Sequence, residues 1–383
     1  MTYIYWASII FILYSYIGYP LLLGLLSLLI TSKKTVIQGD SNNIRRKVSL
    51  LISAYNEESV IEAKILNSLA LDYPRDLLEI VVVSDGSDDQ TDKIVALYAR
   101  ENVILRRYGG RIGKTACLNR AVPLTKGDIT IFSDANSQYS GNAIRQLTKH
   151  FEDDEIGFVS GTTMYVSGGD LGMADSVGLY TKLERLIKSL ETKIGSCVGA
   201  DGAIFAIRKD LYHELKEFDI NDLVIPFNII RQKFRGVFEG EATCVEETAE
   251  TQKREFYRQA RITNRTIRAI FNNTDLVNPF RFGLYSFQLF SHKICKLVIP
   301  YFMIMLLFSN ILLAHDAKGY FLTLVGQLLI YGIAYLGHFR REVFGFSKII
   351  TICHSFVAVN TAILWGWIEY AKGETFTRWT TSR

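Results

Sequence analysis

The chain has 383 residues, a formal net charge of +4 at pH 7 and 49% hydrophobic residues. Its length is enough for one large domain or two modest ones. The small net charge and the lack of a zinc-finger or aromatic RNA-binding motif exclude nucleic acid as the expected partner. The cysteines show no metal-ligand spacing, so we expect buried or membrane thiols in a reducing compartment: Cys117, Cys197, Cys244, Cys295 and Cys353.

The N-terminal segment predicts a transmembrane helix within residues 1–32, which carry no charged side chain. Residues 3–30 are apolar over more than the ~20 residues that a bilayer requires. A cleaved signal peptide is the alternative. It would need a basic leading region, which the segment lacks, and an apolar run of only ~7–15 residues.

Residues 45–250 are polar and predict a globular α/β domain. Short apolar runs rich in Val and Ile alternate with helical patterns, which is typical of buried parallel strands in βαβ units. We expect strands at residues 48–54, 78–84, 103–108 and 128–133.

Polar side chains follow three of these strands. They occur in Tyr55-Asn56-Glu57, Asp85-Gly86-Ser87 and Asp134-Ala135-Asn136. In open parallel sheets ligands bind beyond the carboxyl ends of the strands, so the three segments are predicted to meet at one crevice. Ordinary turns and helix caps, which are rich in Asp, Asn and Ser, are the alternative.

Two features of this domain suggest a phosphate and a metal. The stretch Gly109-Gly-Arg-Ile-Gly-Lys-Thr115 is like a P-loop, but Tyr108 stands where the motif needs glycine. A loop that leads into a helix N-terminus with Lys114 in its first turn remains, and it suits a diphosphate; a solvated lysine is the alternative. Asp134 and Asn136 offer two oxygen ligands for Mg²⁺ or Mn²⁺.

Residues 251–290 predict interfacial helices, one of which is amphipathic. Arg258, Arg261, Arg265 and Arg268 are spaced so that they form one stripe on a helix. The stripe suits either a diphosphate and a sugar chain or lipid headgroups.

The C-terminal region predicts three transmembrane helices within residues 291–370, at 297–314, 319–337 and 349–368, followed by a tail at 371–383. Basic residues beside the spans predict a cytoplasmic central domain. They follow the first span or lie in the loop 338–348, although the basic tail disagrees: Lys33, Lys34, Arg45, Arg46, Lys47, Arg340, Arg341 and Lys348.

In this order the motifs resemble the family 2 glycosyltransferases, and among them the membrane-embedded cellulose, chitin, hyaluronan and poly-N-acetylglucosamine synthases. The resemblance covers roughly residues 45–300 and the placement of the spans. It implies a GT-A fold, a Rossmann-like mixed sheet with flanking helices. It also implies that Asp134 and Asn136 form the DxD-type metal motif. The nucleotide-sugar residues would then include Ala54, Tyr55, Glu57, Asp85, Ser87, Lys114 and Asp134.

The resemblance continues in the second half of the domain. Gly199, Ala200, Asp201 and Gly202 match the acceptor-side loop, for which a glycine-rich turn before an edge strand is the alternative. Asp222 matches the general base, although Ile220-Asn221 replaces the family's Thr-Glu pair, and helix capping is the alternative. Arg258 and Arg261 fall where the family writes QxxRW and would bind the nucleotide sugar. The motif's Gln and Trp are absent, which argues against processive synthesis.

The resemblance therefore implies an inverting membrane glycosyltransferase of a bacterial inner (plasma) membrane. It would transfer a sugar from a nucleotide sugar, with a UDP-sugar expected, to a growing extracellular polysaccharide. Four spans are few for a channel, so a homo-oligomer or a secretion partner is expected. Two alternatives remain open: transfer of a single sugar to a polyprenyl phosphate or other lipid, and a nucleotide-binding membrane regulator with a weakened DxD motif.

Overall fold

The structure is a computed structural model that describes residues 1–29, 46–166, 171–247, 251–339 and 348–377. The chain divides into two compact units. The helical unit comprises Met1–Leu26, Ser167–Tyr180 and Thr248–Glu374. The sheet unit comprises Ser27–Val166, Thr181–Glu247 and Thr375–Arg383.

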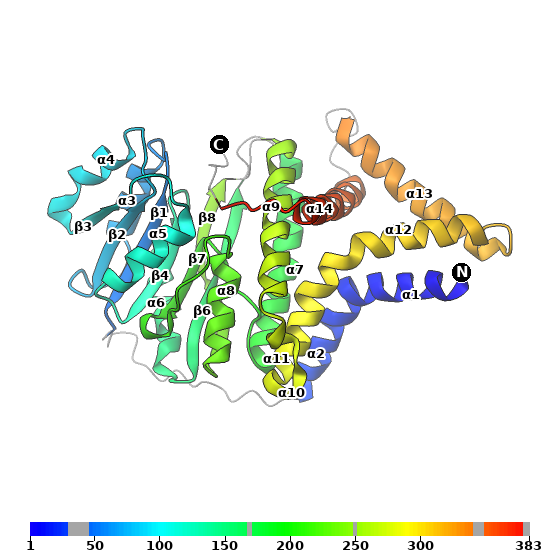
Figure 1. Ribbon diagram of the computed structural model, residues 1–383, viewed down its shortest axis with the longest axis horizontal. Helices are drawn as coiled ribbons and strands as arrows, with labels where there is room; N and C mark the ends of the chain where they lie inside the picture. Colours follow the sequence, from blue (N-terminus) through cyan, green and yellow to red (C-terminus); the bar gives the residue numbers. More distant parts are fainter. Residues whose placement is uncertain (30–45, 167–170, 248–250, 340–347, 378–383) are drawn as a thin grey trace. The chain divides into compact units, whose positions relative to one another are not determined.

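The sheet unit is built on one eight-stranded mixed sheet in the order β3-β2-β1-β4-β7-β6-β8-β5 (Figure 1). Strands β1 to β4 are parallel, whereas β7 runs antiparallel to β4 and to β6. Strand β8 is parallel to β6, and β5 is antiparallel to β8. The strands are β1 (Val48–Ala54), β2 (Leu78–Ser84), β3 (Val103–Arg107), β4 (Ile129–Asp134), β5 (Gln138–Tyr139), β6 (Ile156–Val166), β7 (Ile204–Arg208) and β8 (Arg235–Glu247).

The four strands expected in the first half are present. The predicted bounds of β1 and β2 are correct, β3 ends at Arg107, and β4 is shifted so that Asp134 is its last residue. Strand β7 lies between β4 and β6, so the alternative in which residues 199–202 precede an edge strand is wrong.

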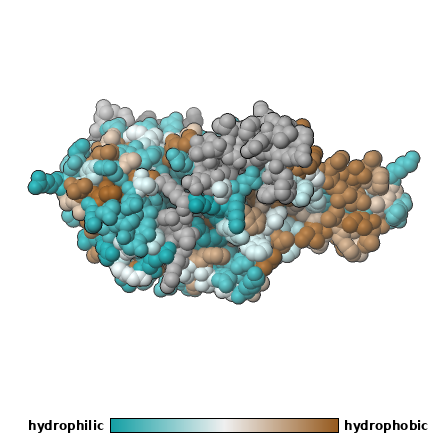
Figure 2. Space-filling view, turned by 90° about the horizontal axis from the view of Figure 1, so that it is seen from above, coloured by the Kyte–Doolittle hydropathy of each residue, from teal (hydrophilic) through white to brown (hydrophobic). Residues whose placement is uncertain are grey.

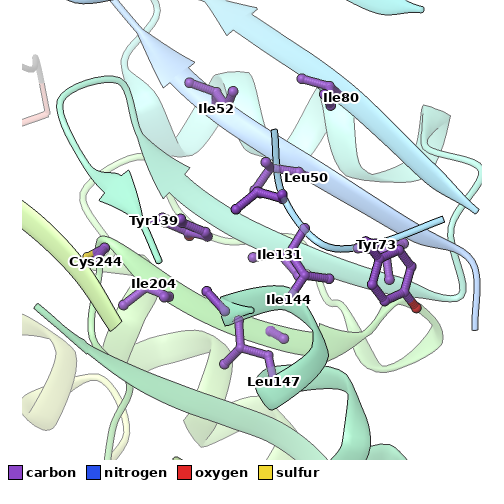
Figure 3. Close-up of a cluster of buried hydrophobic side chains, with 14 of the residues drawn as sticks. Leu50, Ile52, Tyr73, Ile80, Ile131, Tyr139, Ile144, Leu147, Ile204 and Cys244 are labelled. Atoms are coloured by element: carbon purple, nitrogen blue, oxygen red, sulfur yellow. The ribbon is translucent and has the colours of Figure 1, made fainter. Parts of the chain in front are cut away.

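The core of the sheet unit explains why these runs are apolar without alternation. All seven residues of β1 are buried, as expected of a strand covered on both faces. Leu50, Ile52 and Ile131 pack with Ile144 and Leu147 of α6 in one buried cluster (Figure 3). The helices of this unit are α3 (Ile61–Leu69), α4 (Thr91–Leu97), α5 (Lys114–Ala121), α6 (Ala143–Thr148) and α8 (Asn221–Arg231), and α7 (Leu171–Ile194) contributes its residues from Thr181 onward.

The helical unit contains, among the described residues, four helices long and apolar enough to cross a membrane: Thr2–Leu29, Leu284–Leu313, Lys318–Gly337 and Ile349–Ala371. In an 18-residue apolar stretch of each helix, only 17%, 39%, 11% and 17% is buried inside the protein, so most of each stretch is at least partly exposed. Hydrophobic surface gathers over these helices, and hydrophilic surface over the sheet unit (Figure 2). Such exposure in a chain of this hydropathy indicates a membrane protein.

The bounds of these helices refine the prediction. The second span begins at Leu284, earlier than the expected residue 297, because α11 (Leu284–Leu289), a π-helical turn and α12 (Cys295–Leu313) are continuous. The first span is likewise α1 (Thr2–Leu13), a π-helical turn and α2 (Tyr19–Leu29). The remaining helices of this unit are α9 (Gln252–Phe271), α10 (Pro279–Phe282), α13 (Lys318–Phe339) and α14 (Lys348–Ala371).

A chain of polar side chains joins three of the apolar helices. The Asn310 amide donates to the Gln327 amide oxygen (3.0 Å), and the Thr323 hydroxyl donates to Asn310 Oδ1 (3.0 Å). The Tyr5 hydroxyl donates to Thr323 Oγ1 (3.1 Å). Hydrogen bonds of this kind hold helices together in lipid.

Several residues on which the predicted orientation depends lie outside the described residues: Lys33, Lys34, Arg45, Arg340 and Arg341. All five cysteines are free, and all are buried except Cys353, which is half-buried.

Candidate active site

The register of the parallel strands brings the three polar strand ends to one edge of the sheet. Ala54 pairs with Ser84 across β1 and β2, and Ser53 pairs with Asp134 across β1 and β4. Tyr55 and Asp85 therefore follow strand ends that lie level, and Asp134 lies at the same edge of the sheet, level with Ser53.

The segments that follow β1 and β2 are joined by hydrogen bonds. The backbone N–H of Asn56 donates to Ser87 Oγ (3.1 Å), and the N–H of Asp88 donates to Asn56 Oδ1 (3.0 Å). The N–H of Glu57, which is buried, donates to Thr91 Oγ1 (2.8 Å). Asn56 has a φ of +51°, a conformation that asparagine tolerates better than most residues. Ser87 thus shapes this edge.

Asp85 fixes the loop that precedes Lys114. One carboxylate oxygen accepts from the Gly113 N–H (2.9 Å), and the other contacts Cys117 Sγ (3.4 Å). Burial, and then the charge of Asp85, raise the pKa of the Cys117 thiol, so it stays protonated. Gly113 has a φ of +92°, which favours glycine.

The aromatic ring of Tyr55 contacts a cationic side chain. The Arg111 guanidinium lies 4.1 Å from the centre of the Tyr55 ring, a cation–π contact. Arg111 itself has a φ of +54°. The contact ties the loop before α5 to the end of β1.

Lys114 and Asp134 form the central ion pair. Lys114 is the first residue of α5, and its Nζ lies 2.5 Å from Asp134 Oδ1. Both side chains are partly exposed, at 15% and 25%. A lysine at a helix N-terminus beside a carboxylate suits both a phosphate and its counter-cation.

The metal hypothesis fits the donor set of this edge. Among the described residues, no group of three or more His, Cys, Asp or Glu side chains is arranged to hold a metal ion. Asp134 and Asn136 would supply two oxygen ligands. Two suffice for a cation such as Mg²⁺, which is usually bound through one or two protein carboxylates together with substrate phosphates and water.

Asp222 lies against the loop predicted to contact the acceptor. A Cβ placed on Gly202 would lie 3.2 Å from Asp222 Oδ2, so the carboxylate faces a position without a side chain. The Ala200 N–H donates to the Asp222 carbonyl (2.8 Å). Asp222 is half-buried in the first turn of α8.

A further hydrogen bond connects α5, the helix that begins with Lys114, to the segment before α8. Thr115 Oγ1, next to Lys114, donates to the carbonyl of Asp219 (3.0 Å). Because Asp219 precedes α8 by two residues, this bond joins the first turn of α5 to the segment that leads into α8.

Asp201 is engaged within the protein. Its carboxylate accepts from the Thr163 N–H (2.9 Å) and hydroxyl (2.8 Å), and from the Ala203 N–H (3.2 Å). These bonds attach the loop to β6, so Asp201 shapes the loop, and its backbone or its neighbours are the better candidates for acceptor contact.

Arg258 and Arg261 belong to α9 in the helical unit. Arg258 makes a two-pronged ion pair with Glu255 (2.7 and 2.8 Å). Their role in nucleotide-sugar binding stays a prediction.

One charged residue near the site is not among the predicted site residues. Lys64 of α3 is fully buried, with Ile61, Ile65 and Ser68, on the face of the helix that meets the sheet. A lysine at a position where helical spacing demands an apolar residue is the signal that could have found it.

Comparison with known families gives a match to one of them. Residues 49–215 match the family model described as "Glycosyl transferase family 2". These residues include the predicted nucleotide-sugar residues of the sheet unit and the loop at 199–202; Asp222 lies just beyond them.

Two curated relatives illustrate the range of similar proteins. The beta-monoglucosyldiacylglycerol synthase of Trichormus variabilis (strain ATCC 29413 / PCC 7937) is 34% identical over 116 residues, 29% of this chain and 25% of the relative. The poly-beta-1,6-N-acetyl-D-glucosamine synthase of Staphylococcus aureus (strain COL) is 24% identical over 204 residues, 51% of this chain and 49% of the relative. The matches thus span a quarter to a half of these relatives.

A solved structure matches nearly the whole chain. The mannosyltransferase PcManGT from Pyrobaculum calidifontis, solved with GDP-Man and Mn²⁺, superposes with a TM-score of 0.71 over 97% of this chain and 99% of that one, at 18% identity. This likeness confirms the GT-A-like fold class, a mixed sheet with flanking helices and apolar helices at both ends of the chain.

Proposed function

We propose that this chain, which carries a glycosyl transferase family 2 domain at residues 49–215, transfers a sugar from a nucleoside diphosphate sugar to an acceptor hydroxyl at a membrane. The observation that carries the proposal is the tethering of α5 to the segment before α8. It joins the residue next to Lys114 to the segment two residues before α8, the helix that carries Asp222.

The donor would bind at the edge formed by β1, β2 and β4. The N-terminus of α5 and Lys114 would hold the diphosphate, with Lys114 leaving its ion pair with Asp134. A divalent cation, Mg²⁺ or Mn²⁺, held by Asp134 and Asn136 would neutralise charge on the leaving diphosphate. Tyr55, whose ring contacts the Arg111 guanidinium, would contact the nucleotide base.

Asp222 would act as the general base. It takes the proton from the acceptor hydroxyl, whose oxygen then forms a bond to the anomeric carbon. The bond from that carbon to the diphosphate oxygen breaks on the opposite face, so the configuration inverts and a nucleoside diphosphate leaves. Gly202 leaves room beside the carboxylate because a side chain there would approach Asp222 Oδ2 closely.

For the substrates we propose a UDP-sugar and a growing extracellular polysaccharide. The support is the similarity to a poly-beta-1,6-N-acetyl-D-glucosamine synthase over half of this chain. The basic residues after the first span, of which Arg46 and Lys47 are described, support a cytoplasmic sheet unit. A homo-oligomer or a secretion partner belongs to this proposal, since four spans make a small channel.

Transfer of one sugar to a lipid is the second candidate. A relative that is 34% identical is named as a glucosyldiacylglycerol synthase. In addition, the stretch Arg258-Gln-Ala-Arg261-Ile262 lacks the aromatic residue that would stack on a polymer. Arg258 and Arg261 would then serve the nucleotide sugar or the lipid headgroup.

A donor screen tests the proposal. The full chain, purified in detergent, is incubated with UDP- and GDP-sugars, Mn²⁺ and membrane lipids, and nucleoside diphosphate release is measured alongside mass analysis of the products. Release with one donor, abolished in Asp222→Asn, is expected. A polymer supports the polysaccharide; a lipid of defined mass supports the second candidate. Tight nucleotide binding with no release from any donor would overturn the enzyme proposal in favour of a regulator.

A further inference from the structure

Lys64 is a charged residue in the core of the sheet unit. It is 0% exposed. Lysine is almost never fully buried unless its charge is paired. Burial lowers the pKa of Lys64 to about 7, against the effects of Cys244, Asp134 and Glu246, which raise it. An apolar side chain would fill this position at lower cost, so the contacts of the ammonium need an explanation.

The ammonium holds the chain immediately after the metal motif. Lys64 Nζ donates to the carbonyl of Ser137 (2.5 Å), the residue that follows Asn136. The ammonium also lies 3.8 Å from the centre of the Tyr139 ring. Both contacts fall on the segment that leaves the end of β4.

Other bonds fix the same segment. Asn67, one helical turn after Lys64, donates to the Tyr139 carbonyl (2.9 Å) and accepts from the Tyr139 N–H (2.8 Å). The Ser137 hydroxyl donates to the carboxylate of Glu246 on β8. The Tyr139 hydroxyl is within hydrogen-bond distance of the carbonyls of Phe132 (3.1 Å) and Ala203 (3.0 Å), so it links β4 to the residue that precedes β7.

We propose that Lys64 is a positioning residue that holds the metal turn, defined as residues 134–139, in the conformation that presents Asp134 and Asn136 to the cation. The inference rests on the proposed function, because it concerns the same metal site. A site with two protein ligands, one of them uncharged, depends strongly on the orientation of both. Groups that orient metal ligands from outside typically contribute 10–100-fold in metal affinity.

The test uses Lys64→Met in the full chain in detergent and measures binding of UDP or GDP, whichever the wild type binds, with and without Mn²⁺ by calorimetry. We expect the Mn²⁺-dependent affinity to fall about 10–100-fold, while affinity without Mn²⁺ stays unchanged. Ile65→Ala is the matched control. It removes a buried side chain from the same helix, and is expected to lower the melting temperature and leave the Mn²⁺ dependence intact.

Asn67→Ala keeps the inference falsifiable if Lys64→Met does not fold, because it loosens the metal turn from a half-buried position and should weaken Mn²⁺ dependence in the same direction. An unchanged Mn²⁺ dependence in folded Lys64→Met would overturn the inference. If Lys64→Met does not fold, an unchanged Mn²⁺ dependence in Asn67→Ala would overturn it instead. An equal loss of Mn²⁺ dependence in Ile65→Ala would also overturn it. A wild-type chain that binds neither nucleotide with Mn²⁺ would overturn the proposed function and the inference with it.

Discussion

The two halves of the sheet are built differently. The half that we propose binds the donor (the donor half), β1 to β4 at residues 48–134, is all parallel, and its polar groups lie just after or at the ends of strands, apart from Lys114 at the start of α5. The half that we propose binds the acceptor (the acceptor half), β5 to β8 at residues 138–247, mixes parallel and antiparallel pairs. There Asp222 stands on a helix and is positioned by Gly202 and by the bond from Thr115 to Asp219.

The two halves should therefore respond differently to substitution. Groups at parallel strand ends are placed by backbone register, so their variants should alter nucleotide binding with little effect elsewhere. Groups in the acceptor half are placed by contacts between distant segments, so their variants should alter transfer while nucleotide binding persists.

Asp222→Asn should have the largest effect. The amide is isosteric with the carboxylate and cannot take a proton, so transfer should fall roughly 10²–10⁴-fold. Nucleotide affinity should remain within about twofold of wild type. This is a much smaller change in binding free energy than the 1.4 kcal/mol that corresponds to a tenfold change in affinity. Radiolabelled sugar transfer and calorimetric UDP or GDP binding measure the two. Wild-type transfer would remove Asp222 from the mechanism, and a lost nucleotide affinity would abolish the division between the halves.

Lys114→Ala should weaken nucleotide binding about 10–100-fold, because a charged hydrogen bond to phosphate contributes about 1.5–3 kcal/mol. Binding is measured by calorimetry with Mn²⁺ present. Lys93→Ala, which removes an exposed lysine of α4, is the matched control and should bind as wild type. An unchanged affinity in the Lys114 variant would make it a solvated lysine.

Gly202→Ala should reduce turnover by up to about tenfold, because a Cβ 3.2 Å from Asp222 Oδ2 displaces the base by a few tenths of an ångström. Steady-state kinetics should show lower kcat with unchanged nucleotide affinity. Gly141→Ala is the control, since no atom lies within 4 Å of its added Cβ. Equal kinetics in both variants would show that Gly202 does not limit the position of the base.

Glu239 of the acceptor half should affect stability alone. Burial raises the pKa of its carboxyl, but bonds from His150 and Lys149 outweigh burial and lower the pKa to about 2. A lowered pKa stabilises the folded state above the usual value near 4.5, and this stabilisation is lost as the pH falls toward 2.

Glu239→Gln should therefore lower the free energy of unfolding at pH 6 by about 1–3 kcal/mol relative to wild type. This difference should shrink as the pH falls below the usual carboxyl pKa of 4.5. Melting of the detergent-purified chain at several pH values measures this difference. A gap that stays constant with pH would show that the ion pairs with Lys149 and His150 are not its source.

The donor half was largely readable from the sequence. Runs such as Val48–Ala54 are apolar throughout because both faces of a parallel strand are buried, and the residue after each run must then lie at the ligand-binding edge. The helices that could span a membrane were likewise predicted, since length and hydropathy alone define them.

The acceptor half and the metal turn were readable only in part. Asp201 gave the pattern of a ligand-binding loop, yet its carboxylate is bound to Thr163, a residue distant in sequence. Lys64 differs from the pattern of its helix only as a lysine at an apolar position, and its partner could not be predicted, because that partner is the backbone carbonyl of Ser137 and any residue type can supply a carbonyl.

Sequence alone thus determined the elements whose placement follows from local periodicity: the first strands, the polar residues at their ends and the apolar helices. Tertiary structure decided how Asp222 meets Gly202, how Asp201 is engaged and what holds the metal turn. The physical reason is that periodicity encodes which face of an element is buried, whereas a bond between distant segments depends on the register and packing of the whole sheet.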